Sequence, residues 1–85
     1  MNMNESCIVY VLRSDCNPDR YYTGLTNNVE RRLAEHNSGD SKYTAYLRPW
    51  SLVAFTTFKS IDSASAFEKY LKTGSGRAFS KRHFV

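Results

Sequence analysis

Glu68 is the acidic residue whose position most clearly suggests chemistry. It is the sole acid among residues 68–85, and the spacing of Ala64, Phe67 and Leu71 predicts an amphipathic helix around it. At 100° per residue, Glu68 falls at the edge of the apolar stripe of that helix. A carboxylate held at such an edge could ligate a hard divalent cation.

Arg32 and His36 occupy a comparable place in an earlier predicted helix. Both fall at the edge of its core-facing stripe, one turn apart, whereas Arg31 and Glu35 point to solvent. A cation and an imidazole beside the core cost more free energy than the same groups in water. Arg32 and His36 therefore need a reason for their positions, and Arg31 does not.

Each of these residues also has a purely structural interpretation. Arg32 and Glu68 could form an ion pair between two helices, and His36 could be a hydrogen-bonded structural histidine. Packing alone could account for four residues of the predicted strands: Cys7, Tyr10, Tyr21 and Tyr22.

The positive charge lies at one end of the sequence. The formal net charge is +4, and residues 1–67 contain as many acids as Lys and Arg. The whole excess therefore falls in residues 68–85. A local basic surface suits a polyanion such as nucleic acid, although a solvated terminal helix would have the same composition.

The elements that must position these residues alternate between strands and helices. Strands are expected over residues 7–12, 21–23 and 50–58, and the turn residues between the first two predict an antiparallel hairpin. Helices are expected over 29–37, from a cap at Ser60 or Asp62 to Lys72, and over 77–84, with Gly39 ending the first. Residues 38–48 are expected to form a loop with room for one helical turn, and Gly74-Ser75-Gly76 a helix break. The order β-β-α-β-α-(α) predicts an α/β (α+β) fold, a small three-stranded antiparallel sheet flanked by helices.

Length and composition allow one small domain. The chain has 85 residues, so a single domain over 1–85 is expected, with its core at about 7–82. There is no apolar run of membrane-spanning length and no pattern of a signal peptide. Cys7 and Cys16 are too few for a disulfide scaffold, and neither they nor the two histidines have zinc-ligand spacing. A reducing cytoplasmic location, with both thiols reduced, is the expectation.

Four elements in this order resemble the GIY-YIG nuclease family. Tyr10 lies in the first strand, Tyr22-Thr23-Gly24 in the second, Arg32 follows ten residues after Tyr22, and Glu68 lies in a later helix. The resemblance covers about residues 8–82. It is greatest to small stand-alone bacterial members, which are similar to the GIY-YIG nuclease domain of bacterial excision repair.

The resemblance implies a role for each matching residue. Tyr10 and Tyr22 match the tyrosines of the two motifs, Arg32 the catalytic arginine, His36 a position that holds His or Tyr, and Glu68 the metal-binding carboxylate. Gly24 matches the glycine of the second motif, with a structural role in the turn. The implied activity is metal-dependent hydrolysis of DNA by an endonuclease, with RNA not excluded.

The implied reaction uses one Mg²⁺ or Mn²⁺ held by Glu68. Arg32 would stabilise the phosphate in the transition state, and Tyr22 would take a proton from the attacking water. Tyr10 and His36 would orient Tyr22 or relay its proton. Because the sequence has no base-reading motif, we expect recognition by substrate shape or through a protein partner. Five basic residues would bind flanking phosphates: Lys69, Lys72, Arg77, Lys81 and Arg82.

Two departures from the family pattern leave a second interpretation open. Ile8 stands where the first motif opens with glycine, and no asparagine follows Asn37, although the family often has one after the glutamate helix. Ser75 or Ser80 could substitute for that asparagine. The alternatives to an active nuclease are a catalytically silent nucleic-acid-binding module and a protein-interaction domain without a nucleic-acid role.

Overall fold

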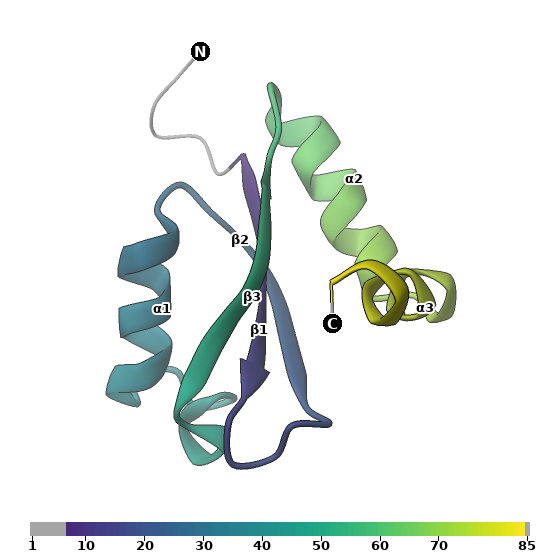
Figure 1. The fold of residues 1–85 in the computed structure, drawn as a ribbon. Coiled ribbons are helices and arrows are strands. Elements are labelled where there is room, and N and C mark those ends of the chain that lie inside the picture. Colours follow the sequence, from purple (N-terminus) through teal and green to yellow (C-terminus); the bar gives the residue numbers. More distant parts are fainter. Residues whose placement is uncertain (1–6, 85) are drawn as a thin grey trace.

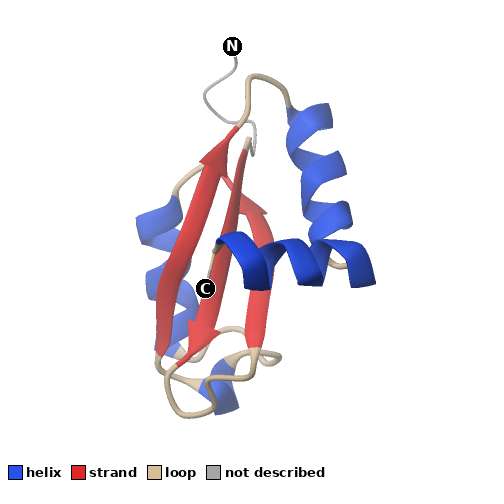
Figure 2. Cartoon of the chain, turned by 45° about the vertical axis from the view of Figure 1, so that its right-hand side comes forward, coloured by secondary structure: helices blue, strands red, loops and turns tan. Residues whose placement is uncertain are grey.

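The computed structural model describes residues 7–84 and has a three-stranded antiparallel sheet in its centre. In chain order the elements are β1 (Ile8–Ser14), β2 (Tyr21–Thr26), α1 (Val29–Ser38), the 3-10 helix η1 (Ala45–Leu47), β3 (Trp50–Thr57), α2 (Ile61–Leu71) and α3 (Gly74–His83). The strand order is β2-β1-β3. Helix α1 covers one face of the sheet, and α2 and α3 lie on the other (Figures 1 and 2). The predicted fold class, element order and antiparallel pairing are confirmed.

The central strand β1 is buried on both faces because its side chains alternate between two cores. Tyr10 and Leu12 pack on the α1 side, and both are at most 1% exposed. Val9 and Val11 pack against α2 and α3. Burying a side chain of this size stabilises the fold by about 1.5–3 kcal/mol. The continuous apolar run of β1 therefore reflects a strand covered on both sides.

Polar side chains cap the start of each α-helix. The Asn28 side chain accepts a hydrogen bond from the backbone of Arg31, and the Ser60 side chain accepts one from Ser63. The first helix ends where Gly39 adopts a φ of 90°, a left-handed conformation that favours glycine. These caps fix the ends of α1 and α2 to within one residue of the sequence-based expectation.

The predicted helix break at Gly74-Ser75-Gly76 is wrong. These residues form the first turn of α3, and the chain turns at Lys72 and Thr73 instead. The Thr73 side chain accepts a hydrogen bond from the backbone of Gly76 and so caps the helix. A Cβ on Gly76 would overlap the carbonyl oxygen of Tyr70. The glycine therefore permits close approach of α3 to the end of α2 and does not end a helix.

The loop after α1 is fastened to the sheet by polar contacts. Asn37 both donates to the carbonyl of Trp50, at 3.0 Å, and accepts from its backbone nitrogen, at 2.6 Å. The Trp50 indole donates to the carbonyl of Thr44, and buried Ser14 donates to the carbonyl of Leu47. These contacts hold residue 44 against the end of α1, which matters for the site described below.

Candidate functional site

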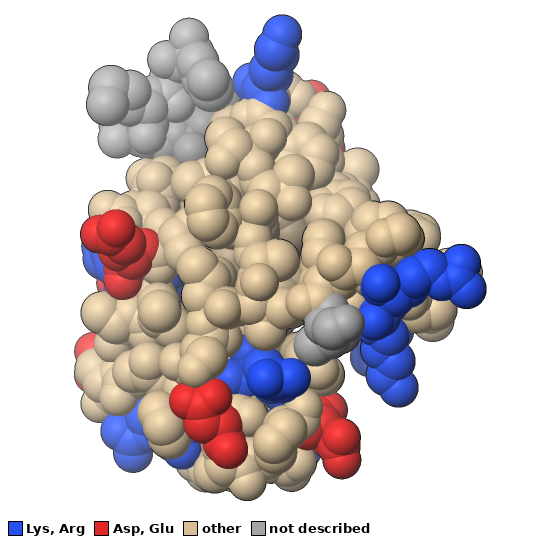
Figure 3. All heavy atoms as spheres, viewed as in Figure 1, with Lys and Arg blue, Asp and Glu red and all other residues tan. Residues whose placement is uncertain are grey.

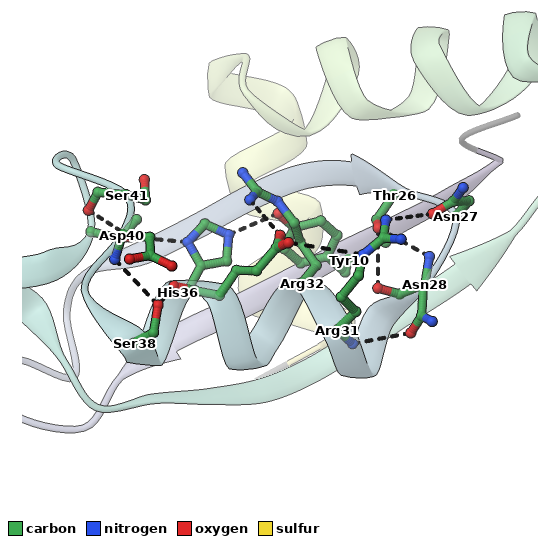
Figure 4. Close-up of polar contacts among 12 residues, drawn as sticks. Tyr10, Thr26, Asn27, Asn28, Arg31, Arg32, His36, Ser38, Asp40 and Ser41 are labelled. Carbon is green, nitrogen blue, oxygen red and sulfur yellow. Dashed lines mark hydrogen bonds and ion pairs between the residues drawn. The ribbon is translucent and has the colours of Figure 1, made fainter. Parts of the chain in front are cut away.

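A chain of three buried side chains crosses the interface between β1 and α1. The hydroxyl of Tyr10 lies 2.9 Å from Nε2 of His36, and Nδ1 of His36 lies 2.9 Å from Oγ1 of Thr44 (Figure 4). All three residues are at most 1% exposed. Sequence reasoning placed Tyr10 and His36 in the candidate site. It missed Thr44, which carried no signal because only the folded loop brings it to the imidazole.

Two hydrogen bonds fix the orientation of the His36 ring. One holds each ring nitrogen, Nε2 to the hydroxyl of Tyr10 and Nδ1 to the hydroxyl of Thr44. A neutral imidazole donates at one nitrogen and accepts at the other, and a hydroxyl can take either role. Both nitrogens of a neutral His36 are therefore satisfied within the core.

The pKa values of both groups are displaced by burial. Burial, followed by the charge of Arg32, lowers the pKa of His36, whereas Glu35 acts in the opposite direction. Burial and the proximity of Tyr22 raise the pKa of Tyr10 to about 12, although Arg32 opposes this. Near neutral pH the pair therefore consists of a protonated phenol and an unprotonated imidazole.

Tyr22 brings a half-buried phenol to this chain from strand β2. Its ring centroid lies 4.6 Å from that of His36 and 6.1 Å from that of Tyr10. Gly24 faces Tyr10 directly across the β1–β2 ladder, and a Cβ there would lie 2.6 Å from the Tyr10 hydroxyl oxygen. The glycine of the second motif therefore makes room for the tyrosine of the first. Its φ is not positive, so the expected turn role is replaced by this close approach.

Arg32 lies beside the tyrosines at the edge of α1, as the helical periodicity predicts. Its side chain is 32% exposed, and Nη1 lies 2.9 Å from Oε1 of Glu35. The hydrogen bond to Glu35 raises the pKa of Arg32, which therefore stays charged. Glu35 lies on the solvent side of α1 as expected, with its side chain 41% exposed, and the spacing of one helical turn also brings it to Arg32. The three-residue spacing could have revealed this contact.

Glu68 is on the other side of the sheet from the buried chain. It belongs to α2, its side chain is 15% exposed, and it forms an ion pair with Lys72 one turn later. Since Arg32 pairs with Glu35 instead, the interhelical Arg32–Glu68 ion pair is wrong. Helix α2 packs against β2, the edge strand that carries Tyr22. The helix that carries Glu68 therefore packs against the strand that carries Tyr22.

A group of three metal-ligating side chains is not found within residues 7–84. The donor chemistry nevertheless fits a hard cation, because Mg²⁺ is commonly held by one or two carboxylates with the remaining positions taken by water and substrate phosphates. Glu68 is one such carboxylate. It would have to exchange its contact with Lys72 for the cation.

The basic residues of the C-terminal segment separate into two groups. Lys72, Arg77 and Lys81 line a groove of about 520 Å³, together with Arg20 from the β1–β2 turn. Lys69 and Arg82 do not line the groove and are exposed. Figure 3 shows basic side chains gathered over α3 on this side of the molecule. No helix within residues 7–84 has the length and apolar character needed to cross a membrane.

Comparison with known proteins assigns this sequence to a family. The sequence family described as the GIY-YIG catalytic domain matches residues 6–82. A UPF0213 protein of Haloquadratum walsbyi is 39% identical over 72 residues, covering 84% of this chain and 79% of the relative. A UPF0213 protein of Clostridium perfringens is 42% identical over 65 residues, covering 75% and 68%. One from Natronomonas pharaonis is 44% identical over 66 residues, covering 76% and 75%. The chain therefore belongs to the GIY-YIG family, a nuclease superfamily, as a small member.

Proposed function

We propose that this protein is a divalent-metal-dependent endonuclease that hydrolyses phosphodiester bonds of DNA. The observation that carries the proposal is the hydrogen-bonded chain Tyr10–His36–Thr44, which is buried directly behind the half-exposed Tyr22 and Arg32. A buried polar network of this kind has a large cost if any member is left unsatisfied. This network lies behind Tyr22 and Arg32 and would keep these two groups in fixed positions.

The degree of exposure divides the candidate residues into two classes. Tyr10 and His36 are too deeply buried to meet a polymer, so they serve as positioning residues for Tyr22. Tyr22 and Arg32 are accessible and are the groups that would touch the substrate. This division favours Tyr22 over Tyr10 as the residue that contacts the attacking water, and the raised pKa of Tyr10 supports the same assignment.

Each accessible residue has a defined part in the proposed hydrolysis. A water oxygen attacks phosphorus, and the bond from phosphorus to the 3′-oxygen breaks. Tyr22 takes the proton of the water in its phenolate form, and the leaving 3′-oxygen takes a proton from solvent. Arg32 donates hydrogen bonds to the phosphate oxygens as negative charge develops on them. Glu68 would hold Mg²⁺ or Mn²⁺, which supplies charge stabilisation for the phosphate and the leaving oxygen. Target choice would come from substrate shape or a protein partner, because the site contains no base-reading element.

The silent nucleic-acid-binding module is the second candidate. Its specific support is the Glu68–Lys72 ion pair, which neutralises the one carboxylate that the proposed cation site needs. The groove cations would still bind phosphates in such a protein. The two candidates differ in what Glu68 does when nucleic acid is present.

A nicking assay separates these candidates. Labelled single-stranded, duplex, flap and branched DNA would be incubated with the protein and Mg²⁺, Mn²⁺ or chelator. The neighbouring arginines provide a matched pair, because Arg31 is exposed and on the same helix. We expect metal-dependent cleavage that Glu68→Ala and Arg32→Ala each reduce by at least about a hundredfold, whereas Arg31→Ala retains it.

One result would contradict the nuclease proposal, and another would contradict the role given to Arg32. If all four substrates stay intact while wild type and Glu68→Ala bind DNA equally, the silent module is the better assignment. If Arg31→Ala and Arg32→Ala lose activity equally, the loss is a general charge effect and not a property of the site.

A further inference from the structure

The groove between the sheet and α3 combines an apolar floor with a basic rim. Val11 and Val53 of the sheet and Leu71 at the end of α2 line its interior. Its volume of about 520 Å³ lies in the range of pockets that enclose small ligands, roughly 300–1,000 Å³. A surface that contacts only a phosphate backbone has no need of such a floor.

The rim collects cations from parts of the sequence that are far apart. Arg77 and Lys81 are one turn apart on α3, Lys72 is at the end of α2, and Arg20 comes from the β1–β2 turn. Asp19 is the one acid among the lining residues. This charge complements a polyanion, and Figure 3 shows basic side chains over α3.

We propose that this groove holds an unpaired nucleotide of the nucleic acid, with its base on the apolar floor and its phosphates on the rim. A base in a duplex is stacked and paired, so it cannot enter a recess between cations. An unpaired base can be splayed out and buried against apolar or aromatic side chains. The preferred ligand class is therefore nucleic acid with a single-stranded segment, such as a flap or an overhang.

The groove lies next to the candidate catalytic residues around one edge of the sheet. Tyr22 borders the groove through strand β2, while its ring packs against His36 on the other face. Arg20 reaches further along the same side and donates to the hydroxyl of exposed Tyr46. A single strand leaving the groove over β2 would pass Tyr22, so the cleaved bond is expected close to the unpaired nucleotide. This inference rests on the proposed function in taking nucleic acid as the ligand.

Binding measured in chelator tests the groove without requiring cleavage. Fluorescence anisotropy would compare a labelled single-stranded oligonucleotide, its blunt duplex, and an abasic strand of equal length and charge. The lining pair Arg77→Ala with Lys81→Ala, both on α3, is matched to Lys69→Ala on α2 with Arg82→Ala on α3, which removes the same charge outside the groove.

We expect the single strand to bind at least about fivefold more tightly than the duplex or the abasic strand, because a base gains contacts in the groove. The lining pair should weaken single-strand binding by about tenfold or more and reduce the salt slope by about 1.4, the value for two lost phosphate contacts. The outer pair should weaken it by no more than about threefold.

Four outcomes would overturn the inference. Equal affinity for the single strand and the duplex would mean that the groove holds no unpaired base. Equal affinity for the abasic strand would mean that binding depends on phosphate contacts only. Equal losses of single-strand affinity in the two variant pairs would mean that the groove has no special part in binding. Poly-glutamate that bound more tightly than the single strand would indicate an acidic protein ligand. Because no bond is cut in chelator, a failed nicking assay with the expected binding pattern would reject the nuclease and retain the groove.

Discussion

The hydroxyl of Tyr10 lies 2.9 Å from Nε2 of His36, and neither side chain is accessible to solvent. A neutral imidazole donates at one nitrogen and accepts at the other. Protonation of His36 would put a donor on both nitrogens within the core, so the hydroxyls of Tyr10 and Thr44 would both have to accept. The two residues couple the protonation state of the core to the geometry of the site.

This coupling predicts that stability falls in mild acid. The pKa of folded His36 is below its ordinary value of about 6.5, so in that range the unfolded chain binds a proton that the folded chain does not. The free energy of unfolding therefore decreases as pH falls through about 6.5 and continues to fall toward the lower, folded pKa. Urea denaturation between neutral and mildly acidic pH would measure the slope.

The second histidine of the chain is the control for this measurement. His83 is exposed on α3, so His83→Gln should keep the pH dependence, whereas His36→Gln should flatten it. If both variants keep the slope of the wild type, the acid sensitivity has another origin.

Tyr10 should ionise only in strongly alkaline solution. Its pKa is raised to about 12, above the ordinary value of about 10, because burial opposes the phenolate. Stability from this group is present below about pH 10 and is lost as pH rises toward 12, since the unfolded phenol loses its proton first. Phenolate absorbance should show a late step that Tyr10→Phe removes. A late step that persists in Tyr10→Phe would assign it to another tyrosine.

Gly24→Ala should destabilise the protein through Tyr10. The added Cβ would lie 2.6 Å from the Tyr10 hydroxyl oxygen, and the tyrosine has no free space because it is fully buried. Forcing a methyl group into a packed core costs about 1–3 kcal/mol. Gly74→Ala is the control, because its Cβ would have no neighbour within 4 Å in a helix. Equal urea midpoints for the two variants would mean that Tyr10 moves aside without cost.

Much of the site follows from helical and strand periodicity. The 100° rotation per residue separates Arg32 from Arg31 in α1, and the structure agrees: Arg32 contacts the tyrosine cluster, and Arg31 is exposed. Pairing of Tyr10 with Gly24 follows once the hairpin register is known. These contacts are local or are fixed by one turn, so sequence spacing is sufficient to predict them.

Contacts that depend on the relative placement of elements could not be predicted in this way. Thr44 reaches His36 only because the loop is held by Trp50, and Arg20 joins the groove only because the hairpin turn meets α3. Composition alone wrongly predicts a helix break at Gly74-Ser75-Gly76, because glycine has a low helix propensity. In the structure the cap from Thr73 and the close approach to Tyr70 outweigh that propensity.

Glu35→Gln should lower the proposed activity more than it lowers stability. The Glu35 carboxylate is the partner that holds Arg32, at 2.9 Å, and both side chains are partly exposed. Exposed ion pairs contribute at most about 1 kcal/mol to folding. A loss of orientation at a phosphate-binding arginine should cost about tenfold in rate, equivalent to about 1.4 kcal/mol. The matched control is Glu30→Gln, an exposed acid of the first turn of α1. Equal rates in the two variants would remove Glu35 from the positioning of Arg32.

Lys72→Gln should strengthen divalent-cation binding in the absence of nucleic acid. Lys72 neutralises the Glu68 carboxylate in the free protein, so a cation must displace its ammonium group before it can bind. Removing this competing ammonium group should raise Mn²⁺ affinity several-fold, because an ion pair of this kind contributes up to about 1 kcal/mol. Electron paramagnetic resonance of free Mn²⁺ during titration would measure this affinity without any cleavage reaction.

Lys69→Gln is the control, because it removes the same charge from the residue next to Glu68 without breaking the ion pair. If long-range attraction alone is responsible, both variants should bind Mn²⁺ more tightly by the same factor. The proposed competition requires a larger increase in affinity for Lys72→Gln. That increase should disappear in the double variant Lys72→Gln with Glu68→Gln. In the nuclease, phosphates bound at the groove rim would compete for Lys72 and release Glu68, so substrate and cation should bind cooperatively.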